Sequence, residues 1–288
     1  MKTSIVLCLA SLLTAPAARA ASNTFTYAVG DVKVTLLSER QQTGDKKILI
    51  GATEEMLKQT APDGTFPNAV NAFLVRTKDQ TILVDAGFGI KLFDNLKEVG
   101  LAPGDIDAVL LTHMHGDHIG GLLRDGKPAF PKADLYIATP ERDYWVGATP
   151  PDSPQRQALA AYADRLHLFN ARPPEDANVR FPLLDNILPI AAYGHTPGHT
   201  VYEVSSGGKR LLIWGDLTHA MAVQMPYPQV AVTYDIDPAQ AVASRKAILD
   251  YVAQKPIPVA GMHIAFPGIG TVTKHPNGDG YTFEPVTP

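Results

Sequence analysis

A ten-residue stretch of the sequence is dense in side chains that bind metal ions. Residues 112–121 read THMHGDHIGG and contain His113, His115, Asp117 and His118. Alternate residues of an extended chain share one face, so the first two histidines can converge on one ion. A turn then directs the carboxylate and the third imidazole toward a neighbouring point. Imidazole and carboxylate suit Zn²⁺ or a similar divalent ion, and four such ligands exceed what one catalytic zinc needs, so the stretch predicts a metal site with room for two ions.

Further histidines and one aspartate follow at the ends of segments that read as buried strands. The stretch YGHTPGHT places His195 and His199 on a turn rich in glycine and proline. Asp216 ends the apolar run LLIWGD, and His263 ends the run PVAGMH. Functional side chains concentrate on loops that a rigid scaffold positions, so these residues are candidates for the same site. Taken singly, each of them is more often structural than functional.

The elements that must position these residues alternate between strands and helices. Strand patterns cover residues 25–37, 69–76, 80–85, 107–111, 134–138, 188–214, 256–261 and 280–284. Helical patterns cover residues 91–100, 140–147 and 155–167. A further helix is expected to begin at Pro238, because Asp237 is a favoured N-cap residue and proline suits the first helical position. The alternation predicts one α/β domain over residues 21–288, with helices covering the sheets.

The first twenty residues, MKTSIVLCLASLLTAPAARA, have the pattern of a cleaved signal peptide. Lys2 supplies the positive start, an apolar run follows, and Ala18-Arg19-Ala20 is a small-x-small cleavage site. The apolar run is shorter than the roughly 20 residues that a membrane-spanning helix needs. We therefore expect an exported protein, periplasmic or secreted, with no membrane segment. The single cysteine, Cys8, lies within this segment, so the mature chain would contain neither a disulfide nor a thiolate zinc site.

The charge of the chain argues against nucleic acid as a partner. Lys+Arg is 25 and Asp+Glu is 29, which gives a net charge of −4. Loss of Lys2 and Arg19 with the signal peptide leaves 23 basic and 29 acidic residues, a net charge of −6. A phosphate-backbone binder usually carries a basic surface instead. We expect a small-molecule substrate as the partner, and a homodimer is the common default for the assembly.

The order of the motifs VDAG, THMHGDH, GHTPGH and GD, followed by a late histidine, resembles the metallo-β-lactamase superfamily over about residues 30–285. The resemblance implies an αββα sandwich: two mixed β-sheets packed face to face, helices outside, and a metal site at one edge. It also implies a ligand set of His113, His115 and His195 for one ion, Asp117, His118 and His263 for a second, and Asp216 as a bridge. Asp85 and His199 would orient these ligands from behind. Zn²⁺ is the expected metal, with Mn, Co or Fe as alternatives.

The C-terminal third indicates a branch of that superfamily. The segments WGDLTHAMAVQ (214–224), HIAFPGIG (263–270) and GDGYTFEPV (278–286) resemble the methyl parathion hydrolase group, which comprises exported organophosphate hydrolases, lactonases and arylesterases. True β-lactamases of this fold lack an aspartate at the position of Asp216. Glyoxalase II enzymes have it, but they work largely in the cytosol and mitochondria. The resemblance thus implies an ester, lactone or phosphotriester hydrolase. The alternatives are another metallohydrolase of the fold, such as a glyoxalase II-type thioesterase or a β-lactamase-like enzyme, and a non-catalytic metal-binding member.

A two-metal site suggests a mechanism and further site residues. Two divalent ions that share a water lower its pKa from 15.7 toward ~7, which supplies a bridging hydroxide as nucleophile. Besides the bridge Asp216, Asp117 is expected to assist the departing alkoxide of a lactone. His219 occupies the place where related lactonases often carry a substrate-binding tyrosine. Phe93 and Trp145 are expected to wall a leaving-group pocket that favours hydrophobic over charged groups.

Overall fold

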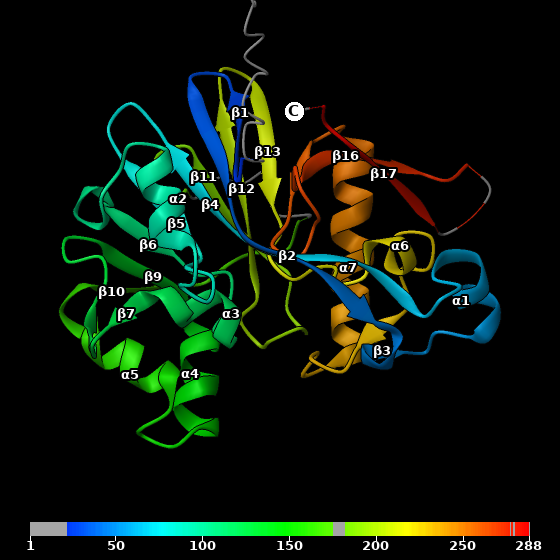
Figure 1. Cartoon of the computed structure of the whole chain (residues 1–288), viewed down its shortest axis with the longest axis horizontal. Helices are drawn as coiled ribbons and strands as arrows, with labels where there is room; N and C mark the ends of the chain where they lie inside the picture. The colour runs from blue at the N-terminus through cyan, green and yellow to red at the C-terminus, as the bar shows by residue number, and fades with distance from the viewer. Residues whose placement is uncertain (1–21, 175–181, 277, 279, 288) are drawn as a thin grey trace, which may run out of the picture.

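The computed structural model describes residues 22–174, 182–276, 278 and 280–287 (Figure 1). The predicted signal peptide, residues 1–20, lies outside this part of the chain. Within it, no helix combines the length and the apolar character that crossing a membrane requires.

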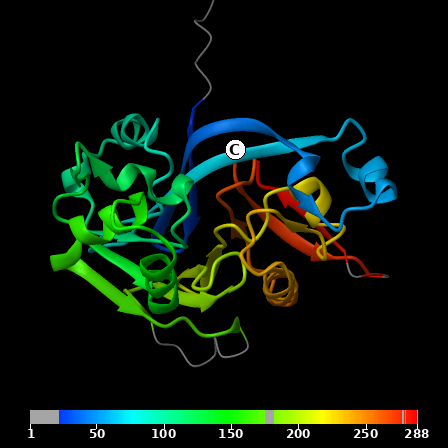
Figure 2. The same cartoon turned by 90° about the horizontal axis from the view of Figure 1, so that it is seen from below.

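The first sheet is seven-stranded and mixed. Its strands, in spatial order, are β1 (Thr24–Val29), β2 (Val32–Asp45), β4 (Thr65–Arg76), β5 (Thr81–Val84), β6 (Ala108–Leu110), β9 (Asp134–Ala138) and β10 (Leu166–Phe169). The pairings from β1 to β5 are antiparallel, and those from β5 to β10 are parallel. β2 and β4 extend as a two-stranded ribbon well beyond the rest of the sheet, across the molecule toward α1 (Glu54–Thr60) (Figure 2).

The second sheet is six-stranded and also mixed. Its strands, in spatial order, are β11 (Ile187–Ala191), β12 (Thr200–Ser206), β13 (Lys209–Ile213), β15 (Val259–Ala260), β16 (Ile269–Lys274) and β17 (Tyr281–Pro285). Only the β13–β15 pairing is parallel among these described strands. Two small two-stranded sheets join β3 (Leu49–Ile50) with β14 (Ala231–Val232), and β7 (Leu123–Arg124) with β8 (Lys127–Pro128).

Alternating apolar residues hold the two sheets face to face. Leu36 and Phe73 of the first sheet belong to the same fully buried cluster as Val204 and Ile213 of the second. Successive side chains of a strand point to opposite faces, so the intervening residues, such as Leu74, pack on the outer side instead. The prediction of two mixed sheets covered by helices is therefore confirmed.

Helices cover both outer faces of the sandwich (Figure 1). The remaining α-helices are α2 (Leu92–Glu98), α3 (Gly116–Ile119), α4 (Thr139–Ala148), α5 (Pro154–Ala161), α6 (Met221–Gln224) and α7 (Pro238–Gln254). Four 3₁₀ turns cover Lys46–Ile48, Pro103–Asp105, Gly120–Leu122 and Ala163–Arg165. α2 and α5 pack on the first sheet and α7 packs on the second. The α7 start is the predicted one, since Asp237 accepts a hydrogen bond from the Gln240 amide at 3.0 Å.

Two expectations about local structure are wrong. The helix expected over residues 155–167 ends at Ala161, because the chain turns and Leu166 begins β10, which pairs in parallel with β9. The sequence predicts no helix or strand between residues 37 and 69, yet this polar stretch contains the second half of β2 and helix α1. The β2 extension is a strand because it pairs with β4, which satisfies its backbone hydrogen-bonding groups. Its weakly apolar sequence has no pattern that predicts a strand.

We predict that Leu211→Ala lowers the free energy of unfolding by about 2–5 kcal/mol, because Leu211 is fully buried between the sheets and the substitution leaves a cavity. Ile90→Ala is the control and should cost less than about 0.5 kcal/mol, because Ile90 is 66% exposed. Urea unfolding in excess chelator measures both without a contribution from bound metal. Equal losses would contradict the placement of the core.

Candidate metal centre

Three imidazole nitrogens form a tight triangle at one edge of the sandwich. His113 follows β6, His115 precedes α3, and His195 lies in the loop between β11 and β12. The His113 Nε2 atom lies 3.0 Å from His115 Nδ1 and 3.2 Å from His195 Nε2, and the latter two atoms are 3.0 Å apart. A tetrahedral zinc with bonds of 2.0–2.1 Å to nitrogen would hold its ligand atoms about 3.3 Å apart. The triangle therefore fits one such ion.

A second group of donors lies beside the first. It consists of Asp117, His118 and His263, whose ligand atoms all lie within 4.8 Å of one another. Asp117 Oδ1 lies 3.7 Å from His118 Nε2, and Asp117 Oδ2 lies 3.5 Å from His263 Nε2. The buried His118 Nε2 atom forms no hydrogen bond, although a carboxylate oxygen of Asp216 lies 3.1 Å away. Two buried polar atoms that approach each other without bonding fit a shared ion between them.

Asp216 stands between the two groups. Its Oδ2 atom lies 3.3 Å from His195 Nε2 in the first group and 3.0 Å from His263 Nε2 in the second. Its Oδ1 atom is the one that approaches His118. Burial by itself would raise the pKa of Asp216, but the surrounding imidazoles, His118 foremost, lower it well below its ordinary value. The carboxylate is thus ionised and placed to bridge two ions.

Asp85 supports the second group from behind. It follows β5 with a left-handed backbone (φ 59°), a conformation that aspartate tolerates better than most residues. One carboxylate oxygen accepts the Thr112 amide hydrogen at 2.7 Å, and the other lies 2.6 Å from His118 Nδ1. A hydrogen bond to Nδ1 leaves His118 Nε2 as the atom that faces the site. In the same way His263 Nδ1 is tied to the Ala69 carbonyl at 2.7 Å.

His199 does not point a free nitrogen at the cluster. Its Nδ1 atom lies 2.9 Å from the Ala192 carbonyl oxygen, and its Nε2 atom accepts the Asp216 amide hydrogen at 3.0 Å. The ring also fills the space above Gly215, where a Cβ would meet it at 2.5 Å. His199 thus positions the backbone of the bridging carboxylate.

Asp235 orients His195, and the sequence analysis did not find it. Its Oδ1 atom lies 2.8 Å from His195 Nδ1, and its Oδ2 atom accepts the Val232 amide hydrogen. Burial lowers the pKa of His195, but hydrogen bonds to Asp216 and Asp235 outweigh it and raise the pKa to about 9. The buried Arg245 guanidinium, 3.9 Å away, balances the Asp235 charge. An aspartate three residues before a helix start carries no recognisable signal in the sequence.

Glu141 is a second residue that the sequence analysis missed. This fully buried glutamate of α4 accepts four hydrogen bonds: from the Met114 amide at 2.8 Å, the Trp145 indole at 2.6 Å, the Thr196 hydroxyl at 2.6 Å and the Gly198 amide at 3.0 Å. Met114 separates two ligand histidines, while Thr196 and Gly198 lie within the GHTPGH turn. One carboxylate therefore fastens two ligand-bearing loops to each other. It lies inside a predicted helix, where a single glutamate gives no sign of this role.

Three other residues named from the sequence lie at different distances from the cluster. His219 adjoins it: its Nε2 atom is 3.0 Å from Asp216 Oδ2, and its ring stacks on His263 at 4.6 Å. The Trp145 ring packs edge-on against His115 at 5.6 Å. Phe93, by contrast, stacks on Phe130 in the outer layer. Neither Phe93 nor Trp145 is among the described residues that line the cavity over the cluster.

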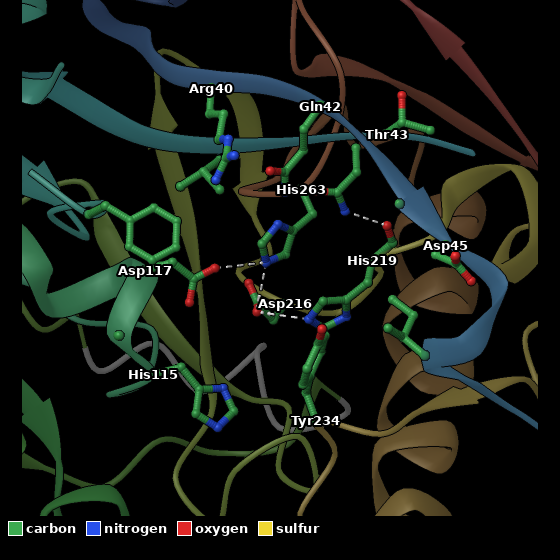
Figure 3. Close-up of a pocket in the computed structure, with 16 residues that line it drawn as sticks. Arg40, Gln42, Thr43, Asp45, His115, Asp117, Asp216, His219, Tyr234 and His263 are labelled. Carbon is green, nitrogen blue, oxygen red and sulfur yellow. Dashed lines mark hydrogen bonds and ion pairs between the residues drawn. The ribbon is translucent and has the colours of Figure 1, made fainter. Parts of the chain in front are cut away.

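That cavity has a volume of about 580 Å³ and opens directly onto the cluster (Figure 3). Its floor includes His115, Asp117, Asp216, His219 and His263. Its walls are mixed: Phe88, Val70, Ile48 and Tyr234 are apolar or aromatic, whereas Arg40, Gln42, Asp45 and Asn68 are polar. The cavity thus combines aromatic and apolar walls with polar ones, and the expected leaving-group residues Phe93 and Trp145 are not among the described residues that form them.

We predict that Glu141→Gln lowers the affinity for the metal about 10- to 100-fold, the usual effect of losing an outer partner of metal ligands. All four partners donate hydrogens, so the amide group of glutamine would face donors where the carboxylate accepted. Asp143→Asn on the same helix is the control, because that carboxylate is exposed. Competition with a chromogenic chelator measures both affinities, and equal values in the two variants would rule out the role.

Two solved structures resemble nearly the whole chain. A crystal structure of the hydrolase AbOPH in the beta-lactamase superfamily has a TM-score of 0.82 and 28% identity, and the match covers 93% of this chain and 99% of that one. The dizinc quorum-quenching lactonase AidC, in complex with a hexanoyl-homoserine product, has a TM-score of 0.83 and 26% identity, covering 92% and 98%.

Curated relatives match over shorter stretches. The exodeoxyribonuclease WalJ of Streptococcus pneumoniae is 45% identical over 53 residues, 18% of this chain and 20% of its own. A probable metallo-hydrolase of Mycobacterium tuberculosis, Rv2300c, is 27% identical over 177 residues, 51% of this chain and 56% of its own. The chain thus spans between a fifth and about half of the length of these relatives. The family model of the metallo-beta-lactamase superfamily matches residues 65–263, well over half of the chain and every residue of the cluster. With its histidine-rich metal-binding cluster, this chain belongs to the metallo-beta-lactamase superfamily as a metal-dependent hydrolase.

Proposed function

We propose that the protein is a dinuclear zinc hydrolase of small esters and lactones, with phosphotriesters as further substrates. The observation that carries this proposal is the position of Asp216, whose carboxylate approaches donors of both ligand groups at 3.0–3.3 Å. A carboxylate so placed suits a pair of ions and not a single one. The dizinc state of the lactonase AidC, and the hexanoyl-homoserine product bound there, support the metal and the substrate class.

When bound, two divalent ions would supply an activated water and would polarise the scissile carbonyl or phosphoryl oxygen. The residues of the chain bind the ions, orient the ligand rings and position the substrate. His113, His115 and His195 would hold one ion, while Asp117, His118 and His263 would hold the other. The buried partners Asp85 and Asp235 keep ligand rings in the required orientation, and the cavity above them positions the substrate.

Asp117 and His219 are the residues placed to act on the substrate. Asp117 lines the cavity, and its side chain is 23% exposed, more than that of any other proposed second-ion ligand. It can therefore reach a departing oxygen. His219 also lines the cavity, and burial foremost lowers its pKa to about 4. The lowered pKa keeps the imidazole neutral at pH 7, so His219 adds no positive charge beside the substrate.

A further part of the proposal concerns the location of the enzyme. We propose that it is exported, on the signal-peptide pattern of residues 1–20.

A thioesterase of the same fold is the alternative function. A panel of substrates distinguishes the two, since a thioesterase would cleave thioesters and leave lactones intact.

The purified mature protein should contain about two zinc ions per chain, and a chelator should abolish hydrolysis of p-nitrophenyl acetate and δ-valerolactone. Added Zn²⁺ should restore both activities. Metal analysis by mass spectrometry, run beside the assays, measures occupancy. Less than one ion per chain after reconstitution would contradict the dinuclear site, whereas two ions with activity on thioesters only would keep the site and change the substrate.

We further predict that Asp117→Asn lowers kcat/KM for δ-valerolactone about 100-fold more than for p-nitrophenyl acetate, the scale of general acid catalysis. The alkoxide of the lactone needs a proton to depart, which the ionised Asp117 carboxylate would first accept from the attacking water and then donate, whereas p-nitrophenolate needs little help. Both substrates are assayed on one preparation of known metal content, so loss of metal alone would reduce them together. Equal reductions would refute this role of Asp117.

A further inference from the structure

The cavity over the cluster has one wall that the proposed chemistry does not use. The ribbon of β2 and β4 forms this wall (Figure 3). Arg40 and Gln42 of β2 line the cavity, and so do the residues that pair with them across the ribbon, Val70 and Asn68. Paired residues lie on the same face of a ribbon, so this face as a whole is turned toward the site.

A β-bulge fixes the position of Arg40. The β2–β4 register shifts between Ser38 and Arg40, and the extra residue, Glu39, turns its side chain inward. Its buried carboxylate accepts the amide hydrogens of Phe88 at 2.6 Å, Lys91 at 3.1 Å and Leu92 at 2.9 Å. Bulges redirect side chains and recur beside active sites. Here the bulge anchors the loop that carries Phe88 and leaves the neighbouring Arg40 facing the cavity.

Arg40 is exposed to solvent where it lines the cavity. It points into the cavity above Asp117 and His263 (Figure 3), yet among the described residues its side chain has no hydrogen bond or ion pair. It is also the one lysine or arginine among the described residues that line the cavity. By contrast, Gln42 and Asn68 beside it are already engaged, since Gln42 donates to Asn68 and Asn68 donates to the His219 carbonyl, each at 2.8 Å.

The net charge of the site indicates which kind of group would pair with the Arg40 guanidinium. Two divalent ions would bring four positive charges, whereas the carboxylates among the described residues that line the cavity, Asp45, Asp117 and Asp216, bring three negative ones, so a further cation above the ions is electrostatically unfavourable unless an anion lies between. The five N–H groups of arginine form a planar fork that matches the two oxygens of a carboxylate.

We propose that Arg40 is a substrate-binding residue, and that the preferred substrate is an ester or lactone that carries a carboxylate on its acyl side. This inference rests on the proposed hydrolytic function and specifies its substrate. The guanidinium binds the carboxylate while the scissile carbonyl lies over the metal centre. The apolar residues on the other walls, Phe88 and Tyr234, contact the remainder of the molecule.

Two matched substrates test the proposal. Mono-p-nitrophenyl adipate and p-nitrophenyl hexanoate have the same chain length and leaving group, and differ by a carboxylate in place of a methyl group. The wild-type enzyme should have the higher kcat/KM on the adipate. Arg40→Gln should lower the adipate-to-hexanoate ratio about 10- to 100-fold, the range for a hydrogen bond to a charged group. Arg40→Lys keeps the charge without the fork and should give an intermediate ratio.

Lys33→Gln is the matched control, because it removes one positive charge from an exposed position of the same strand outside the cavity. It should leave the ratio unchanged. A ratio that is the same in Arg40→Gln and wild type, or that falls as far in Lys33→Gln, overturns the proposal. Equal losses on both substrates in Arg40→Gln would overturn it as well, since they would indicate a structural role.

A binding measurement separates this proposal from the hydrolytic function. Calorimetric titration of the metal-loaded protein with adipate and with hexanoate compares the same two acyl groups without any turnover. Adipate should bind at least 10-fold more tightly, and Arg40→Gln should remove that difference. If neither ester is hydrolysed but this result holds, the hydrolytic function fails while the role of Arg40 stands. If adipate binds no more tightly than hexanoate, the role of Arg40 is overturned whatever the enzyme hydrolyses.

Discussion

A carboxylate buried among imidazoles is the constraint on which the rest of the structure depends. Asp216 follows β13 of the second sheet, whereas His113 and His118 follow β6 of the first. Burying these groups is costly unless each has a partner. The shared edge of the sandwich supplies partners by bringing the two strand ends together. The two sheets are thus joined at this edge by ion pairs of Asp216 with His113 and His118, in addition to the apolar core between them.

The groups that hydrogen-bond to the ligand histidines follow from the same constraint. A ring nitrogen can face a metal only if the other nitrogen is held, and here the Ala69 carbonyl, Asp85 and Asp235 hold three of them. Each of these two carboxylates is in turn fixed by a backbone amide. Glu141 adds the remaining connection, since it fastens the loop before α3 to the loop before β12. The ligands are therefore oriented by layers of hydrogen bonds that begin in the sheets.

The sequence allowed the sheets and the ligand candidates to be predicted, because both leave local signals. Period-two apolar runs indicated most strands, and His-x-His-x-Asp-His is dense enough to stand out. Glu141 and Asp235 left no such signal, because their roles arise only when distant segments meet. Asp235 and His195 lie 40 residues apart in the sequence, and Glu141 and Thr196 lie 55 residues apart. The extension of β2 was missed for a related reason. Its polar residues form a strand because β4 lies alongside, and pairing of that kind is not encoded in either segment alone.

The pocket residues show where resemblance alone fell short. The aromatic Phe93 was expected at the substrate, yet it completes the outer layer against Phe130, where a large ring fills space beneath helix α2. The cavity instead takes its character from the β2–β4 ribbon, which carries a cation and two amides on one face. Metal ligands are constrained by coordination geometry, so motifs identify them across a superfamily. The walls above them are free of that constraint, and in this chain a bulge in β2 leaves one arginine facing the cavity.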